Sequence, residues 1–283
     1  MTRTNTRQQH RRHRNATPVF DLTLLLYGLI PALLLPSLTW IVSLFKGDVS
    51  IVDSLWSLIF LALSATWFIS YEYPTQRSVV VLVLVAVWAL RLSAYITWRN
   101  WDDGEDARYQ AMRRNYSPNF ALKSLFIVFL LQGVLAWVIS LPLLAAITGS
   151  RPLNLLDALA VVLVIFGILF ESIADAQLAA FKARPDTQGR VMDTGLWRYT
   201  RHPNYFGECC VWWGLYLFAA AAGGSWSILS PLLMTFLLLR VSGVALLEKD
   251  IAERRPGYAD YIDRTNAFLP GIPRGTVKTV AQK

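Results

Sequence analysis

The run RVMDTGLWRYTRHPNYFGE, from Arg190 to Glu208, is the densest group of chemically active side chains in the sequence. Its cations precede Pro203, which suits the first turn of a helix because that position does not use its N–H. Guanidinium forks beside the positive end of a helix are typical of a phosphate-binding site. The residues that we expect at this site are Arg190, Arg198, Arg201, His202, Asn204, Tyr205 and Glu208. The alternative is a basic loop that is attracted to anionic lipid.

Ionisable side chains also lie inside stretches that are otherwise apolar, where a charge is costly and therefore points to function. They are Asp53, Arg91, Glu171, Asp175, Glu208 and Arg240. Glu171 and Asp175 have the i, i+4 spacing that places both on one helix face. Glu248 follows Arg240 by about two turns, on roughly the same face, and opens a tail run typical of an amphipathic helix. This helix either folds over the basic run and closes a pocket or is a solvated tail helix. The alternative is that these groups pair with one another and hold helices together.

The composition places these residues in a membrane protein. Hydrophobic residues make up 54% of the 283-residue chain and charged residues 16%, against about 25% charged residues in soluble proteins. Eleven tryptophans and eleven tyrosines fit the aromatic belts at bilayer surfaces. The net charge of +8 indicates loops that face anionic lipid, and no nucleic-acid partner is expected. No metal site is expected either, because the sequence has only three histidines.

Seven stretches are apolar and long enough, at roughly 20 residues, to cross the hydrocarbon core as helices. They are residues 22–45, 51–70, 79–98, 121–148, 155–180, 205–222 and 226–247. The expected fold is an all-α polytopic membrane helix bundle with about seven transmembrane helices. Residues 21–272 are expected to form one domain, between a basic disordered tail (1–20) and a flexible C-terminal tail (273–283).

Lysine and arginine positions predict the orientation. They are most numerous in the 99–123 loop, the 181–204 loop and the C-terminal tail, which places these segments in the cytoplasm. The expected nucleotide pocket therefore faces the cytoplasm. The arginines of residues 1–20 oppose this orientation.

Residues 195–208 resemble the C-terminal signature of the steroid 5α-reductase-like membrane proteins. The whole chain more closely resembles a bacterial subgroup of these, known mainly as a domain of unknown function (DUF1295). Further similar pieces are VDSLW (52–56), WALRL (88–92), GEDARY (104–109), Gln132–Gly133 and LEK (247–249). The resemblance covers roughly residues 25–272 and favours a bacterial inner membrane.

This resemblance implies an NADPH-dependent reductase that transfers a hydride to the β-carbon of a lipophilic conjugated ketone. By motif position, the residues that hold the cofactor would be Asp175, Arg190, Tyr199, Asn204, Glu208 and Arg240. Glu171 stands where the steroid enzymes have asparagine. The tyrosine and glutamate pair that polarises the ketone in those enzymes has no clear match.

Reduction of an enone needs a donor for the carbonyl oxygen, and a dry pocket strengthens any donor aimed at that oxygen. Arg91, or Tyr95 one turn further along, is the expected donor. The region around Asp53 and Arg91 corresponds to the catalytic region of the family, so all three residues are catalytic candidates.

Two other classes stay open. Residues 201–207, Glu248 and the 258–270 run are also similar to membrane methyltransferases of the isoprenylcysteine carboxyl type, which bind S-adenosylmethionine. The arginines favour the anionic NADPH, whereas Glu171, Asp175 and Glu208 suit a cationic sulfonium. The third class is a non-enzymatic membrane protein.

Overall fold

The computed structural model describes residues 21–101, 104–241, 243–244, 248, 255 and 257–274. These residues are helical or irregular and include no strand. The chain divides into two compact units. Unit 1 comprises Met1–Ala160 and Leu215–Ser230, and unit 2 comprises Val161–Gly214 and Pro231–Lys283. The expected disordered tail (1–20) and most of the expected C-terminal tail lie outside the described residues.

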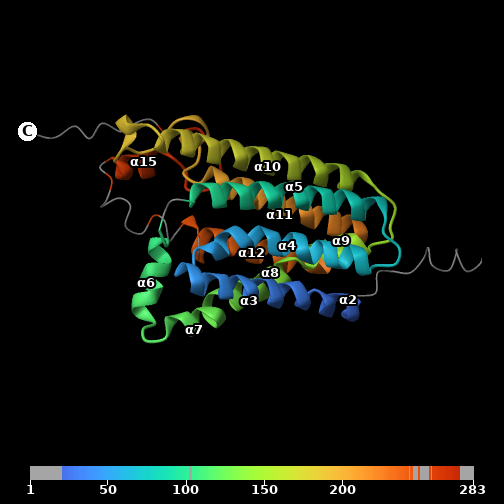
Figure 1. Cartoon of the computed structure of the whole chain (residues 1–283). Coiled ribbons are helices and arrows are strands. Elements are labelled where there is room, and N and C mark those ends of the chain that lie inside the picture. The colour runs from blue at the N-terminus through green and yellow to red at the C-terminus, as the bar shows by residue number, and fades with distance from the viewer. Residues whose placement is uncertain are drawn as a thin grey trace, which may run out of the picture. The chain divides into compact units, whose positions relative to one another are not determined.

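Unit 1 is built around α4, which packs against α3, α5, α8 and α9 (Figure 1). Its helices are α2 (Leu22–Tyr27), α3 (Leu29–Lys46), α4 (Ile51–Ser70), α5 (Gln76–Arg99), α6 (Ala107–Asn115), α7 (Phe120–Ser124), η1 (Leu125–Leu130), α8 (Leu131–Ile139), α9 (Leu141–Thr148) and η4 (Ser225–Ile228). The short helix α6 lies at the end of unit 1 where α3 stops and α4 begins (Figure 1).

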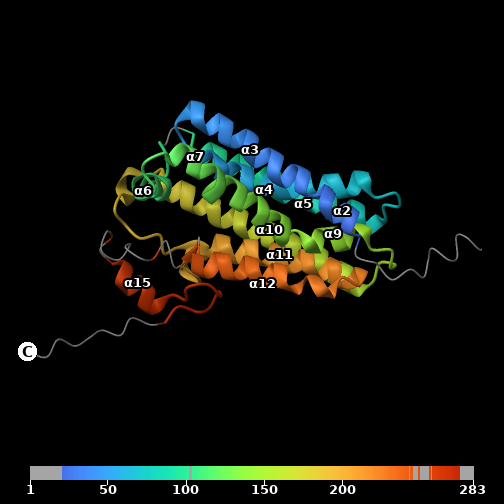
Figure 2. The same ribbon diagram turned by 90° about the horizontal axis from the view of Figure 1, so that it is seen from below.

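Unit 2 contains η2 (Pro185–Thr187), η3 (Gly195–Arg198), α12 (Leu229–Phe236, from Pro231), η5 (Leu237–Val241) and α15 (Tyr258–Arg264). Two long helices contribute to both units: α10 (Leu155–Lys182) and α11 (Pro203–Ala222). Within unit 2, α12 runs beside α11 (Figure 2), and Trp213 Nε1 donates to Thr235 Oγ1 at 3.2 Å.

In the part of the chain that the structure describes, five helical stretches are long and apolar enough to cross a membrane: Leu22–Lys46, Ile51–Ser70, Gln76–Arg99, Phe120–Ile139 and Leu155–Lys182. Large apolar side chains cover their outer faces, as at Leu90 and Val162, which are 56% and 66% exposed. Such exposure suits lipid. The predicted multi-pass membrane protein is therefore confirmed. Neither α11 nor the shorter apolar segment Ser225–Val241 is among the five.

The prediction of one uninterrupted helix over residues 121–148 is wrong. The helix stops at Ile139, and α9 starts again at Leu141 with Pro142 in its first turn. A proline inside a continuous helix would clash with the carbonyl four residues earlier, so the chain ends one helix and begins another. Of the predicted 226–247 span, the structure describes a helical stretch only as far as Val241.

Unit 1 contains a buried ion pair whose two residues, Arg77 and Asp157, were not among the residues predicted from the sequence. Arg77, at the start of α5, is fully buried and binds Asp157 of α10 with two hydrogen bonds, at 2.6 and 2.9 Å. The same guanidinium donates to the carbonyl of Arg151 at 2.8 Å and to that of Pro152 at 3.1 Å. Because its partners lie over 70 residues away, no local pattern marks Arg77 as a structural residue.

Candidate functional site

The predicted binding run forms a tight loop on the last turns of α10. Gly195 has φ +60°, and a Cβ there would lie 2.5 Å from the Gln177 side chain, so only glycine suits the position. Gln177 Oε1 accepts a hydrogen bond from Leu196 N at 2.9 Å. Trp197 Nε1 donates to the Ala174 carbonyl at 3.0 Å. Helix α10 therefore fixes the start of the loop.

The C-terminal segment folds over this loop, which is one of the two arrangements that the sequence left open. Arg201 N donates to the Asn266 carbonyl at 2.9 Å, and Gly271 N donates to the Tyr199 carbonyl at 3.0 Å. The Thr200 hydroxyl donates to the Phe268 carbonyl at 2.8 Å. Within the described residues 257–274, α15 contributes seven helical residues. Backbone hydrogen bonds join the part that follows α15 to the loop.

Arg201 and His202 bind the protein itself. Arg201 pairs with both oxygens of Glu248, at 2.7 and 2.9 Å, and also donates to the Ile262 and Thr265 carbonyls. His202 Nε2 lies 2.9 Å from Glu248 Oε1, and its ring stacks on Tyr205 at 5.6 Å between centroids. Burial alone would raise the pKa of Glu248, but hydrogen bonds from His202 and Arg201 lower this pKa to about 2.

Three carboxyl side chains predicted at the site are buried in unit 2: Glu171, Asp175 and Glu208. Glycines allow the two helices that carry them to approach closely. A Cβ on Gly207 would lie 2.7 Å from Glu171 N, and one on Gly167 would lie 2.6 Å from the Gly207 carbonyl. The structure thus places an acidic pair of α10 beside the first turns of α11.

Asn204 lies in the first turn of α11, one turn before Glu208. Its Oδ1 is buried and accepts no hydrogen bond from any residue that the structure describes. A buried oxygen without a donor is unfavourable, and a ligand that supplied an N–H or O–H group would relieve that cost.

Three predicted cations contrast with Arg201. Arg190, Arg198 and Arg240 are exposed. Their guanidinium groups form no hydrogen bond or ion pair with the described part of the chain. Tyr199 is likewise exposed, at 44%. Among the described residues, therefore, no side chain or carbonyl occupies these three guanidinium groups.

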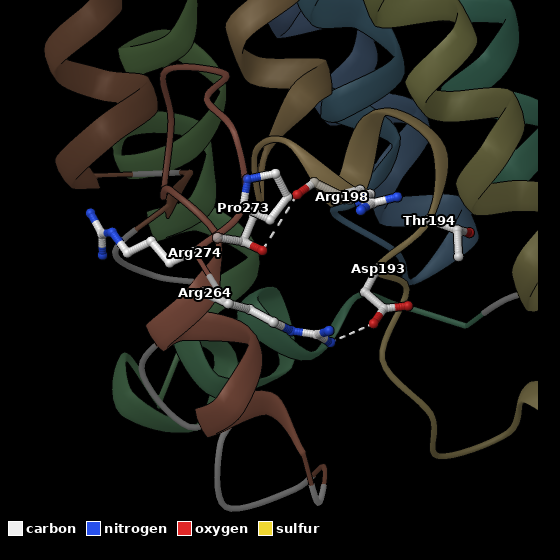
Figure 3. A pocket seen from close by; sticks show the side chains of 7 residues that line it. Asp193, Thr194, Arg198, Arg264, Pro273 and Arg274 are labelled. Atoms are coloured by element: carbon white, nitrogen blue, oxygen red, sulfur yellow. Dashed lines mark hydrogen bonds and ion pairs between the residues drawn. The ribbon is translucent and has the colours of Figure 1, made fainter. Parts of the chain in front are cut away.

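Two cavities open beside the loop. One, of about 420 Å³, is lined by Arg198, Arg264, Arg274 and Thr194, with Asp193 between Arg198 and Arg264 (Figure 3). The other, of about 660 Å³, includes Arg190 and Gly189 in its lining. Both share Asp193 and Arg264, which form an ion pair.

The sequence-based site omitted Asp193, Arg264 and Arg274. Asp193 belongs to the basic run, but Arg264, its partner, is 71 residues away. Arg264 Nε is buried and lacks a hydrogen-bond partner among the described residues. Only the folding of the tail over the loop brings these arginines to the predicted run.

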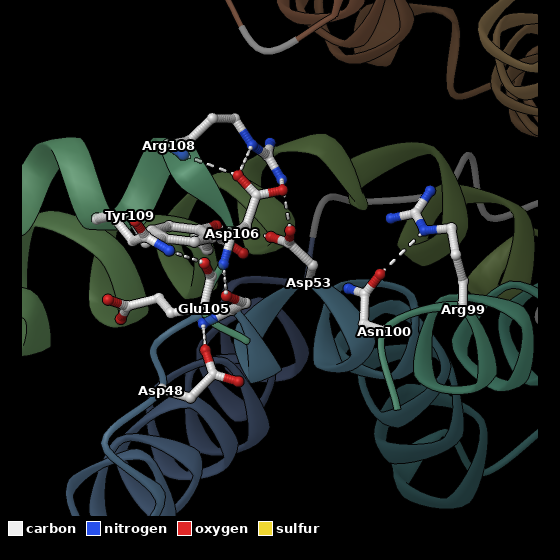
Figure 4. Close-up of polar contacts among 11 residues, drawn as sticks. Asp48, Asp53, Arg99, Asn100, Glu105, Asp106, Arg108 and Tyr109 are labelled. Atoms are coloured by element: carbon white, nitrogen blue, oxygen red, sulfur yellow. Dashed lines mark hydrogen bonds and ion pairs between the residues drawn. The ribbon is translucent and has the colours of Figure 1, made fainter. Parts of the chain in front are cut away.

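The predicted catalytic residues all lie in unit 1. Asp53 accepts hydrogen bonds from Tyr109 at 2.6 Å and from Arg108 at 2.8 Å (Figure 4). On α5, the Arg91 guanidinium carbon lies 6.0 Å from the centre of the Tyr95 ring, as their one-turn spacing predicts. Tyr109 was not predicted as a site residue, although it ends the GEDARY piece, because its partner is 56 residues away.

The described part of the chain is helical and has five apolar stretches of membrane-crossing length, which defines a class, the multi-pass membrane proteins. More specifically, the sequence pattern of the family described as "protein of unknown function (DUF1295)" matches residues 39–265. The chain belongs to this family, as the sequence analysis predicted.

The chain is also similar to an uncharacterized protein of Schizosaccharomyces pombe, with 28% identity over 280 residues. The match covers 87% of this chain and 79% of the fungal protein. A fungal relative gives no support to the expected bacterial inner membrane. No solved structure matches the chain.

Proposed function

We propose that this protein is a membrane-embedded NADPH-dependent reductase of a lipophilic conjugated carbonyl compound. The observation that carries the proposal is the pair of arginine-lined cavities in unit 2, which share Arg264. NADPH carries three phosphate groups, and guanidinium forks bind phosphate oxygens in pairs. The guanidinium groups of Arg190 and Arg198 form no hydrogen bond or ion pair with a described residue, which supports a polyanionic ligand at these cavities.

The polar residues around α11 also fit this cofactor. In the proposal, Arg190, Arg198 and Arg264 bind its phosphates, and Asn204 Oδ1 accepts a hydrogen bond from it. Arg201, His202 and Glu248 act indirectly, by holding the tail over the loop. Bound NADPH would supply the hydride, and the protein supplies position and electrostatics.

The carbonyl of the substrate needs a hydrogen-bond donor as negative charge develops on its oxygen. Arg91 and Tyr95 remain the proposed donors. Asp53 is proposed as a positioning residue, because it accepts the hydrogen bond of the Tyr109 hydroxyl.

The proposal includes seven membrane spans and a pocket that faces the cytoplasm. α11 has 20 residues, which as a helix extends about 30 Å, the thickness of the hydrocarbon core. The Ser225–Val241 segment is apolar but shorter. In the proposal, α11 and this segment are the sixth and seventh membrane spans, beside the five longer stretches. The 181–204 loop then lies in the cytoplasm.

A specific observation favours a second candidate, a methyltransferase that uses S-adenosylmethionine. The carboxyl groups of Glu171, Asp175 and Glu208 are buried in unit 2, where they suit a cation better than an anion. S-adenosylmethionine carries a sulfonium, so it is the second ligand to test.

Thermal unfolding of the detergent-purified protein tests the proposal, with NADPH, NADH and S-adenosylmethionine added separately. A ligand at a hundredfold excess over its dissociation constant stabilises the folded state by roughly 2.7 kcal/mol. We expect NADPH to raise the midpoint and Arg190→Ala or Arg198→Ala to reduce that rise. Arg184→Ala is the matched control, because Arg184 is exposed in the same loop and pairs with Asp186. A rise with S-adenosylmethionine alone would favour the methyltransferase instead.

A further inference from the structure

A polar cavity of about 200 Å³ lies in unit 1, far along the sequence from the arginine-lined cavities. It forms where α3 ends, α4 begins and α5 ends. Its lining includes Lys46, Asp48, Ser54, Thr97, Asn100 and Trp101. The volume is below the roughly 300–1,000 Å³ of most pockets for drug-sized ligands, so the cavity suits a small polar group.

The cavity offers a cation and an anion to a ligand. Lys46 Nζ makes no hydrogen bond or ion pair with any residue that the structure describes. Asp48 uses Oδ1 to accept the Ser50 N–H at 2.7 Å, and its Oδ2 accepts nothing from the described residues. Asp106, by contrast, is held by Arg108 at 2.9 Å (Figure 4). A zwitterion with a phosphate and an ammonium group would satisfy both Lys46 and Asp48.

The position of the cavity indicates that a membrane lipid would supply such a zwitterion. All three helices at its edge are long and apolar enough to cross a membrane. Their ends carry exposed aromatic rings at Phe45, Trp98 and Trp101, which are 87%, 65% and 75% exposed. Aromatic side chains of this kind gather at the level of lipid headgroups. The cavity therefore faces the headgroup layer, with apolar surface beside it for acyl chains.

We propose that this cavity binds the headgroup of an aminophospholipid, with its primary ammonium at Asp48 and its phosphodiester at Lys46. A primary ammonium donates hydrogen bonds, which the trimethylammonium of phosphatidylcholine cannot do. The carboxylate of Asp48 disfavours phosphatidylglycerol, whose headgroup has no cation. The cavity shares no lining residue with the arginine-lined cavities of unit 2, and its occupant is phosphatidylethanolamine.

The test uses the purified full-length protein in mild detergent and titrates short-chain phosphatidylethanolamine, phosphatidylcholine and phosphatidylglycerol. The dissociation constant of each comes from the shift in thermal midpoint. We expect phosphatidylethanolamine to bind about tenfold more tightly than the other two. Asp48→Asn keeps an acceptor for Ser50 N but removes the charge, so it should abolish the preference.

Lys46→Gln is the second variant and should weaken binding of all three phospholipids, since each has a phosphodiester. Asp186→Asn, an exposed carboxylate of unit 2, is the control and should change nothing. Equal affinity of the wild-type protein for the three lipids would overturn the proposal. So would an unchanged preference in Asp48→Asn. Because the readout is lipid binding, its outcome is independent of any nucleotide.

Discussion

Arg201 shows how a single side chain holds the C-terminal tail. Its side chain is 8% exposed, and it joins Glu248 to two backbone carbonyls of the tail. Removing one member of a buried ion pair leaves a charge without its partner and costs about 3–5 kcal/mol. We therefore expect Arg201→Met to lower the free energy of unfolding by about that amount. Arg184→Met, which breaks an exposed pair, should leave the midpoint of denaturation almost unchanged.

The same pair predicts how stability depends on acid. The pKa of Glu248 is about 2 in the folded protein, whereas the ordinary value, which applies to the unfolded chain, is 4.5. A lowered carboxyl pKa stabilises the folded state fully above about pH 4.5, and this contribution is lost as the pH falls towards 2. Thermal midpoints between pH 3 and pH 6 measure the effect. Glu248→Gln should flatten the acid side of that curve, and an unchanged curve would refute the assignment.

The sequence predicted which residues of the candidate site carry chemically active side chains more readily than it predicted what each of them binds. The run 190–208 stands out because cations, asparagine and acids gather before a proline. Whether a given arginine binds a ligand or the protein depends on residues far away in the sequence. The Arg201 guanidinium pairs with Glu248 across 47 residues, whereas the Arg198 guanidinium forms no hydrogen bond or ion pair with a described residue. No local pattern distinguishes the two.

The close contact between helices α3 and α8 allows a prediction about stability. A Cβ on Gly133 of α8 would lie 2.0 Å from the Ala32 carbonyl of α3. Gly133→Ala must therefore push these helices apart, at a cost of roughly 1–3 kcal/mol. Gly104→Ala is the control, since no described residue other than its chain neighbours has an atom within 4 Å of its Cβ position. Thermal midpoints compare the two, and an equal effect would contradict the close approach.

Helix boundaries followed the apolar runs where polar residues bound the run and no proline breaks it, as at residues 51–70. Residues 51–70 were predicted and observed as α4, because polar residues bound that run on both sides. The 121–148 run is apolar throughout, so hydropathy does not mark the end at Ile139. Pro142 was the available signal, and its restricted backbone outweighs the apolar pattern there.

Orientation in the membrane is a prediction for the whole molecule. With Cys209 and Cys210 replaced by alanine, Gln110→Cys in α6 should react with a membrane-impermeant maleimide from the cytoplasmic side. Tyr73→Cys, in the exposed connection between α4 and α5, should react from the opposite side. Labelling of intact cells and inverted vesicles measures both. Reversed labelling would place the arginine-lined cavities outside the cytoplasm and contradict the proposed orientation.

The most direct test of the proposed reductase is an equilibrium titration of the purified protein with NADPH, followed by nicotinamide fluorescence. We predict saturable binding that Arg198→Ala weakens about tenfold, because each charge-assisted contact to phosphate contributes about 1.5–3 kcal/mol. Arg184→Ala should bind like the wild-type protein. Absence of saturable NADPH binding by a protein that binds S-adenosylmethionine would contradict the reductase and assign the arginine-lined cavities to another ligand.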